Sequence, residues 1–294
     1  MPSYSICNLL GADRCTNDLV VTTIRQFMLE HPDIQFPHRH FFYQIVYFTQ
    51  TGGTHSIDFQ HFEVTEGQIY LMAPGQIHSW HFTPETEGII VNFNENFFSS
   101  VFQDAHFMRQ FPMFHHHQNN AVILPEEDAL LEISKIFEDL LAEFNQHHAF
   151  RTEALRGLLL LLITRLSRVA SPTDSAGISK HNLQMMRQFE QLIDAHFKEK
   201  RLPKEYAELL FITPNHLNAL CNQITGKSAG ALIRERVLLE AQRLLSHSDL
   251  MISQIALKLH FEDNAYFSRF FKKYTGVPPE DFRATILRGS RSNP

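Results

Sequence analysis

Cysteine is scarce in this chain, and long hydrophobic runs and a secretion signal are missing from it. Cys7, Cys15 and Cys221 are the only cysteines among 294 residues, and no CxxC motif is present. This usage indicates a reducing compartment in which the thiols act as small apolar side chains. No stretch approaches the roughly 20 apolar residues that a membrane span requires, and no basic segment precedes an apolar run at the N-terminus. The sequence therefore predicts a cytoplasmic protein with no membrane partner.

Positive charge is scarce in the first part of the chain compared with the second. Residues 1–182 contain 10 Lys and Arg against 20 Asp and Glu, whereas residues 183–294 contain 16 against 12. A basic second half beside an acidic first half indicates a polyanionic partner for the second half only. Chance drift in surface charge is the alternative explanation, and this asymmetry by itself does not decide between them.

Two hydrophobic patterns divide the chain. Residues 34–94 contain short segments rich in β-branched and aromatic residues, separated by Gly, Pro or acidic breaks, which predict the strands of a sandwich or small barrel. Apolar residues then recur every three or four positions over 126–148 and 151–169, which predicts two helices. A run rich in Ser, Pro and Gly follows them, and the pattern after it is helical. The expected fold is α+β, with a first domain at 1–170, a linker at 171–182 and a second domain at 183–294.

The second half contains an internal repeat. "YAELLFITPNHLNALCNQITG", which ends at Gly226, matches "IALKLHFEDNAYFSRFFKKYTG", which ends at Gly276, with one extra residue in the turn of the second copy. Each copy has the pattern of two short helices around a tight turn. Thr213 is expected to cap the second helix of the first copy, and Asp263 or its neighbour Glu262 that of the second. Helical spacing over 231–245 predicts one long helix between the copies. The expected buried stripes are Leu217, Leu220 and Ile224 in the first copy and Phe267, Phe270 and Tyr274 in the second.

The segment "IALKLHFEDNAYFSRFFKKYTGVPPEDFR" resembles the C-terminal signature of AraC/XylS-type bacterial transcription regulators, and the resemblance extends over about the last 110 residues. It implies a seven-helix domain with two helix-turn-helix units whose second helices enter successive major grooves of DNA. Ala219, Cys221 and His260 depart from the family, which usually has Arg, Phe and Gly at these positions. The residues that align with base-facing positions are Asn215, Asn218, Asn222, Asn264, Ser268 and Arg269, and those expected to contact phosphate are Lys272 and Lys273.

The segments "HRHFFYQ" and "GQIYLMAPGQIHSW" resemble parts of a cupin-type β-barrel, the usual sensory partner of such DNA-binding domains. Cupin enzymes bind a metal through two His, a Glu and a further His. The corresponding residues here are His38, His40, Gln44 and His78. A neutral Gln at the Glu position argues against a catalytic metal site. We therefore expect these four residues and Trp80 to contact a small organic effector, with no cofactor, no metal and no catalytic residue. The tract "FHHHQNN" at 114–120 is expected to be a solvated loop.

The residues and resemblances together predict a sequence-specific transcription regulator, which family analogy makes an activator. Its expected partners are double-stranded promoter or operator DNA, a small-molecule effector, a second copy of the chain and RNA polymerase, at the nucleoid of a bacterial cytoplasm. Two alternatives stay open. One is a metal-dependent cupin enzyme fused to a DNA-binding domain, and the other is a ligand-independent DNA-binding factor whose barrel is a dimerisation scaffold. The stripe of the helix at 126–148 can pack on its own barrel, on the next helix or on a partner.

Overall fold

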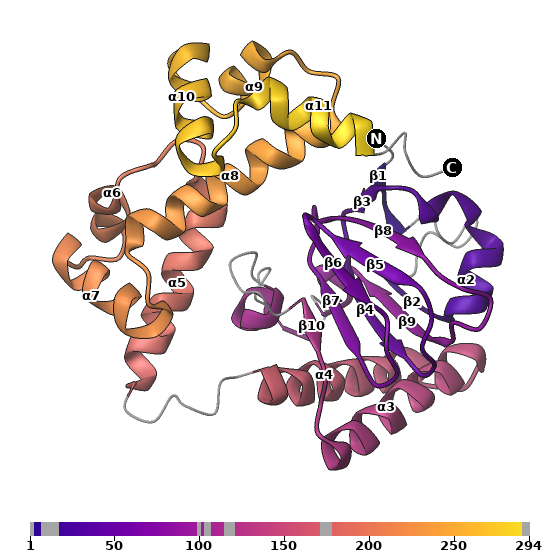
Figure 1. Ribbon diagram of the computed structural model, residues 1–294. Coiled ribbons are helices and arrows are strands. Elements are labelled where there is room, and N and C mark those ends of the chain that lie inside the picture. The colour runs from indigo at the N-terminus through magenta and orange to yellow at the C-terminus, as the bar shows by residue number, and fades with distance from the viewer. Residues whose placement is uncertain are drawn as a thin grey trace. The chain divides into compact units, whose positions relative to one another are not determined.

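A computed structural model of the chain describes residues 3–6, 18–98, 101–102, 107–114, 121–170 and 178–289. The chain splits into two compact units, Met1–Asp174 and Ser175–Pro294, and Figure 1 labels the elements of both. Cys7, Cys15, most of the tract at 114–120 and most of the linker expected at 171–182 lie outside the described residues. No helix in the part of the chain that the structure describes is long and apolar enough to cross a bilayer.

Two five-stranded sheets form the first unit, and among the described residues β1 and β3 pair in parallel while the other strand pairs are antiparallel. The outer sheet has the order β1 (Ser3–Tyr4), β3 (His38–His40), β8 (Ile77–His81), β5 (Thr54–Ile57) and β6 (Gln60–Glu63). The middle sheet has the order β10 (Val122–Ile123), β7 (Ile69–Met72), β4 (Tyr43–Phe48), β9 (Gly88–Phe93) and β2 (Leu19–Thr23). The strands predicted over 34–94 are therefore present. Three α-helices complete the unit: α2 (Ile24–Glu30), α3 (Glu127–Asn145) and α4 (Arg151–Ala170). Its short 3-10 helices are η2 (Pro32–Gln35), η3 (Glu95–Phe98), η4 (Phe107–Gln110) and η5 (Pro112–Phe114).

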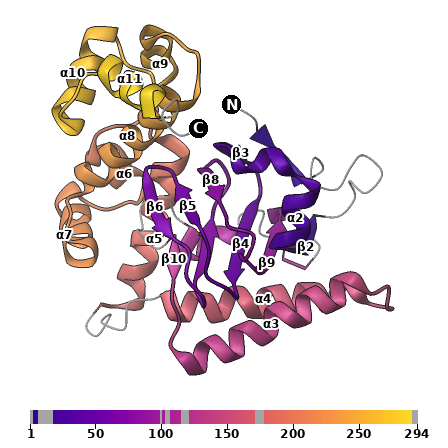
Figure 2. The same ribbon diagram turned by 45° about the vertical axis from the view of Figure 1, so that its right-hand side comes forward.

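The middle sheet is buried on both faces. Val46 and Ile90 pack with Trp80 of the outer sheet in one hydrophobic core. Their sequence neighbours Ile45 and Val91 point the opposite way, into a core shared with α3 and α4. Two buried faces explain why "YQIVYF" and "GIIVNF" lack the alternation of a half-exposed strand. Figure 2 shows α3 and α4 side by side against the strands, so the apolar stripe of α3 packs on its own barrel and on α4.

Seven helices make up the described part of the second unit. They are α5 (Lys180–His196), α6 (Pro203–Leu209), α7 (Pro214–Thr225), α8 (Ala229–His247), α9 (Ile252–Lys258), α10 (Asn264–Thr275) and α11 (Pro279–Gly289). The repeat is present as α6 with α7 and α9 with α10, and the long helix expected between them is α8 (Figure 1).

The two copies share their turn geometry. Phe211 and His260, which follow the first helix of each copy, both have a left-handed backbone with φ of 56°. The next amides, of Ile212 and Phe261, donate to the carbonyls of Ala207 and Ala256 at 3.0 and 2.9 Å, which closes both helix ends. The caps are also as predicted: the Thr213 side chain accepts from the His216 amide, and Asp263 accepts from the Tyr266 amide.

The buried stripe of α10 differs from the prediction. Phe267 and Phe271 are fully buried, whereas Phe270 is half-buried and Tyr274 is 42% exposed. Placing Tyr274 inside was therefore wrong. The spacing of four residues that continues from Phe267 leads to Phe271, whose ring meets Phe282 of α11 with centroids 5.3 Å apart. In α7, Leu217 and Leu220 are buried as predicted, together with Cys221, while Ile224 is only half-buried.

The left-handed Phe211 gives a test of backbone strain in the first repeat. Its side chain is 95% exposed, so replacing it removes almost no packing. Because a side chain costs about 1–2 kcal/mol in this backbone region and Gly adopts it freely, Phe211→Gly should raise the free energy of unfolding by about 1 kcal/mol. Urea titration measures the change. Phe211→Ala is the control, and equal stabilisation by Ala would assign the effect to loss of the exposed ring rather than to the backbone.

Candidate DNA-binding surface and candidate effector site

Helix α10 has one apolar face and one polar face. Phe267 and Phe271 anchor it in the core of the second unit. Asn264 and Arg269, the predicted base-facing residues, are exposed, and so are the two predicted phosphate contacts, Lys272 and Lys273. In the described part of the chain no ion pair engages Arg269, Lys272 or Lys273. The structure therefore leaves their charges available on one surface, as nucleic-acid binding requires.

The corresponding helix α7 offers fewer free side chains than the sequence suggested. Asn215 and Asn222 are exposed. Asn218 is half-buried, and its carboxamide oxygen accepts a hydrogen bond of 3.0 Å from the Ala229 amide at the first turn of α8. That Asn218 faces bases stays a prediction, and because its oxygen is used within the fold, such a contact would have to come from its NH2 group. Ser268 occupies the same place in the second repeat and is also half-buried.

The sequence reading missed three exposed side chains on these two helices. His216 and Gln223 lie on the exposed part of α7, and Tyr266 of α10 is 49% exposed. His216 and Tyr266 occupy equivalent positions of the repeat, fifty residues apart. Comparing the exposed positions of the two copies pairwise, instead of comparing only with family positions, would have found both residues.

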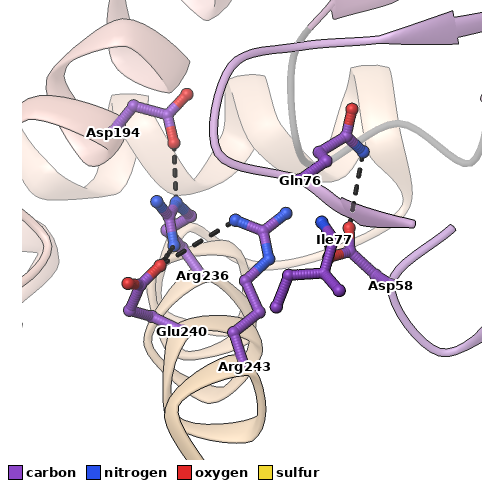
Figure 3. A network of polar contacts seen from close by, with 7 residues as sticks. All are labelled: Asp58, Gln76, Ile77, Asp194, Arg236, Glu240 and Arg243. Carbon is purple, nitrogen blue, oxygen red and sulfur yellow. Dashed lines mark hydrogen bonds and ion pairs between the residues drawn. The ribbon is translucent and has the colours of Figure 1, made fainter. Parts of the chain in front are cut away.

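Several cations of the second unit serve the fold instead of a ligand. Figure 3 shows Arg236 of α8 between Asp194 of α5 and Glu240, with bonds of 2.7 and 3.2 Å. Its guanidinium also lies 4.0 Å from the centre of the Phe197 ring, and Arg243 reaches the same Glu240 at 3.8 Å. Only 7% of Arg236 is exposed, so this charge is unavailable to DNA.

The histidines predicted for the effector site come together between the two sheets. His38 pairs with His78 across β3 and β8, and their ring centres lie 4.2 Å apart. The His40 ring is 4.9 Å from His78. All three are at most 2% exposed. Strand alternation aims them at the inter-sheet core, because His78 shares its face with Trp80.

Trp80 is a core side chain in this structure rather than an open stacking face. It is fully buried and packs on Phe27 and Phe82, with ring centres 5.7 and 5.0 Å away. Its indole N–H donates to His78 Nδ1 at 2.7 Å. This bond helps to orient the His78 ring, and direct contact of Trp80 with an effector stays a prediction.

A fourth buried histidine, His55, was missed by the sequence reading. It faces Trp80 across β5 and β8, and its Nε2 lies 3.2 Å from His78 Nδ1. Since His78 Nδ1 already accepts from Trp80, His55 Nε2 must be the donor, and the His78 proton sits on Nε2. The His55 ring also lies 4.8 Å from Tyr70 of the middle sheet, so this residue spans the space between the sheets.

Gln44 lies on the middle sheet and is paired with another residue that the sequence reading missed. Its side-chain nitrogen donates to Asn92 Oδ1 at 2.8 Å, across the registered pair of β4 and β9. Both side chains are at most 1% exposed. They share their strand faces with Val46 and Ile90, so they point toward the outer sheet and its histidines. No hydrogen bond between described residues joins Gln44 to those histidines.

This buried polar cluster, defined as His38, His40, Gln44, His55, His78 and Asn92, is not satisfied internally. Among the described residues, five of its atoms have no hydrogen-bond partner: His40 Nε2, Gln44 Oε1, His55 Nδ1, His78 Nε2 and Asn92 Nδ2. His40 Nδ1 donates to the Phe42 carbonyl at 2.7 Å, so its Nε2 carries a lone pair. The cluster therefore presents three acceptors and two donors, which matches a ligand that bears hydroxyl groups.

Burial keeps the imidazoles neutral. It lowers the pKa of His40 and of His55 to about 3, with a further lowering from the neighbouring His38. The pKa of His78 is also well below its ordinary value, chiefly through burial. A metal would need converging lone pairs, but the His78 proton sits on Nε2. No group of three metal-ligating side chains of suitable geometry occurs among the described residues.

The turn that leads into β8 is fixed by polar contacts on the outer sheet. The Gln76 side chain accepts from the Ala73 amide at 2.7 Å and donates to Asp58, whose other oxygen accepts from the Ile77 amide (Figure 3). These contacts set where β8 begins and hence which of its residues face the core. The "PGQ" turn therefore has a structural role in placing His78.

Known proteins similar to this chain are transcription regulators. A family model described as an AraC-like ligand binding domain matches residues 29–163, and one described as a helix-turn-helix domain matches residues 206–285. The HTH-type transcriptional activator RhaR of Yersinia pestis (biovar Antiqua, strain Angola) is 23% identical over 254 residues, 85% of either chain. RhaR of Cronobacter sakazakii is 42% identical over 72 residues, 24% of this chain and 25% of that one. Among solved structures, ToxT of Vibrio cholerae with a bound unsaturated fatty acid gives a TM-score of 0.41 at 14% identity, covering 90% of this chain and 94% of that one.

The neutral histidines predict that acid destabilises the protein. In the unfolded chain these imidazoles take up protons near pH 6.5, at the ordinary pKa of histidine, whereas the pKa of His40 and of His55 in the folded state is about 3. The contribution of these two histidines to the free energy of unfolding is therefore fully present above about pH 6.5. It falls as the pH decreases toward 3, by up to about 1.4 kcal/mol per pH unit for each group. Urea unfolding at a series of pH values measures the slope.

His55→Gln should make that slope shallower. The matched control is His81→Gln on the same sheet, where the side chain is exposed and solvated in both states. An equal slope in the His55→Gln variant and the unsubstituted chain would contradict the assignment to buried neutral histidines.

Proposed function

Because the chain belongs to the AraC-type family of DNA-binding regulators, we propose that it is a transcription activator controlled by a small organic effector. The observation that carries the DNA-binding part is the doubled helix-turn-helix unit, whose second copy leaves Arg269, Lys272 and Lys273 exposed and outside any ion pair among the described residues. Activation is supported by the names of the RhaR relatives, which are called transcriptional activators. Residues 171–182 are proposed to form the linker that joins the two domains.

The two recognition helices are proposed to contribute unequally. Helix α10 supplies Arg269 and Asn264 for base edges and two lysines for phosphate, whereas the exposed predicted residues of α7, Asn215 and Asn222, are uncharged. Arg reads guanine through two parallel hydrogen bonds, and Asn reads adenine in the same way. Helix α10 is thus the main source of affinity, and α7 adds contacts without charge.

The effector is proposed to bind at the buried polar cluster between the sheets. The supporting observation is its five unpartnered polar atoms, since leaving a buried donor or acceptor unpaired costs roughly 1–3 kcal/mol. A neutral molecule with several hydroxyl groups supplies both donors and acceptors. Binding requires the aromatic side chains around the cluster to move, because Trp80 and Phe42 are buried in the free structure.

An enzymatic role is not favoured. The buried polar cluster contains no carboxylate or thiol, and burial lowers the pKa of its His40 and His55 imidazoles to about 3, which makes them weak general bases. The neutral Gln44 and the His78 proton on Nε2 also oppose a catalytic metal. The function of the barrel is therefore proposed to be sensing.

Further partners follow from the regulator role. We propose a homodimer that acts in the bacterial cytoplasm, at the nucleoid, and contacts RNA polymerase at the promoter. The apolar stripe of α3 is already used by its own barrel, so a dimer contact on these helices would use outward residues such as Leu131 and Leu161, which are 73% and 43% exposed. Analytical ultracentrifugation of the full chain measures the oligomeric state, and a monomer throughout would remove this part of the proposal.

Arg269→Ala tests base reading by α10. The bound DNA is first obtained by selection from a random library. The variant should lose about 1–3 kcal/mol of binding to the selected sequence and accept other bases at one position.

Lys272→Ala is the matched cation control on the same helix. It should weaken binding to all sequences and reduce the slope of log K against log salt by about one unit. Equal losses of Arg269→Ala on selected and random DNA would contradict base reading, and an unchanged slope in Lys272→Ala would contradict a phosphate contact.

A thermal-shift screen of sugars, polyols and aromatic acids tests the effector site. A hydroxyl-bearing effector at about 100 times its Kd should stabilise the first unit by about 2.7 kcal/mol, because it binds only the folded state. Asn92→Leu removes one donor of the cluster and should abolish that shift, while the exposed variant His81→Gln should keep it. Stabilisation that survives in Asn92→Leu would place the effector elsewhere. No shift by any compound would favour the scaffold alternative.

A further inference from the structure

A hollow at one edge of the first unit lies outside both sites described above. Ends of several elements surround it: the residues where β2 begins, the 3-10 helix η3, the last turn of α3 and the first turns of α4. Its cavity volume is about 150 Å³, and it opens to solvent. A cavity of this volume can hold a benzene-sized molecule. The walls come from both the barrel and the α3–α4 pair.

Two arginines from the start of α4 line the hollow, and each is held by the protein. Arg151 donates from Nε to the Glu143 carbonyl at 3.2 Å and from Nη2 to the Phe144 carbonyl. Its guanidinium lies 4.8 Å from the centre of the Phe144 ring. These contacts fix the plane of the group while leaving Nη1 hydrogens unused among the described residues. An arginine fixed in this way is prepared for a carboxylate.

Arg156 is anchored in a parallel manner one turn later. Its Nε donates to the Phe97 carbonyl at 2.8 Å, and the group lies 5.2 Å from the centre of the Phe97 ring. Only 21% of its side chain is exposed. The neighbouring carboxylate of Glu153 is 3.6 Å from Nη1, but it is 64% exposed, and an exposed ion pair of this kind is weak. Most of the hydrogen-bonding capacity of the Arg156 side chain therefore remains for a ligand.

Charge and shape together indicate the class of ligand. Besides the two arginines, Asp18 is the one carboxylate that lines the hollow among the described residues, and its Oδ1 accepts from Asn94 at 3.0 Å. With the exposed Glu153 beside Arg156 also counted, the two guanidinium charges are balanced, so binding of an anion relies on the unused N–H groups and not on net charge. Leu19, Phe97 and Leu155 are at most 7% exposed and contribute little surface, so the exposed lining is mainly polar. Two fixed guanidinium groups in such a hollow match a small molecule that bears a carboxylate.

We propose that this hollow is a second small-molecule site, which binds a small organic carboxylate independently of the buried polar cluster. The carboxylate lies between the guanidinium groups of Arg151 and Arg156. Such a ligand joins the barrel edge to the start of α4. It therefore stabilises the attachment of the α3–α4 pair to the barrel.

Fluorine NMR of p-fluorobenzoate with the full-length chain tests the site. The probe should bind with a Kd of about 1 mM or tighter, as expected for so small a molecule. The uncharged p-fluorobenzamide should bind at least about tenfold more weakly because it cannot form the charged pairs. No binding of p-fluorobenzoate, or equal binding of the amide, would overturn the proposal.

Three variants locate the binding. Arg156→Gln should weaken p-fluorobenzoate binding at least about tenfold, because it removes one of the two charged pairs. Thr152→Glu should do the same at an exposed position, because it places a carboxylate beside the arginines without removing any anchoring bond. Arg165→Gln is the matched control, since Arg165 lies further along α4 and pairs with Glu132 at 3.2 Å, away from the hollow. An unchanged Kd in both pocket variants, or an equal loss in Arg165→Gln, would overturn the assignment. Asn92→Leu should bind the probe normally, which separates this site from the proposed effector site.

Discussion

Buried and half-buried arginines hold the second unit together, and the spacing of its two recognition helices depends on them. Arg236 ties the long helix α8 to the end of α5 through Asp194 (Figure 3). Arg201, which precedes the first repeat, donates to the Leu259 carbonyl in the second repeat and stacks 3.7 Å from the centre of the Phe261 ring. Arg283 of α11 donates to the Leu245 carbonyl in the last turn of α8. Two helices can read successive major grooves only at a fixed separation, so these bonds between elements are a condition for function.

These bonds also change the meaning of the charge asymmetry. The sequence counts every Lys and Arg of the second half toward a polyanion partner, but a guanidinium enclosed by carbonyls, carboxylates and aromatic rings contributes little to the outer field. Among the described residues of the second unit, the exposed cations outside ion pairs are Arg269, Lys272 and Lys273 on α10, together with Lys204 on α6 and Lys258 on α9, so α10 carries most of them. The electrostatic argument for DNA is therefore better made from one helix than from the net charge of a domain. It also explains why α7 can be uncharged without loss of the basic surface.

Features that depend on residues close together in the sequence could be predicted. Contacts between strands could not, because they depend on the strand register. The repeat, its caps Thr213 and Asp263 and the strands of the barrel follow from local sequence, because each depends on neighbouring residues. The prediction that Tyr274 points inward was wrong. The apolar residues of α10 allow two buried stripes, and packing against Phe282 of α11 selects the one that contains Phe271. His55 and Asn92 were missed because a single polar residue in a strand has no partner until the register is known. The register supplies them, opposite Trp80 and Gln44.

The position of the unsatisfied polar atoms is the strongest reason to regard the barrel as a sensor. The same strands pack a continuous apolar core on the face toward α3 and α4, so this sequence is capable of building one. On the other face it places four histidines and two carboxamides, and burial must keep the imidazoles neutral. A scaffold used only for dimerisation would be more stable with apolar residues there, because unpaired buried donors and acceptors lower stability. A ligand that pairs with them recovers this free energy only in the bound state. Binding of the proposed effector at the polar cluster would therefore make the stability of the first unit depend on the ligand, which is what a sensory domain requires.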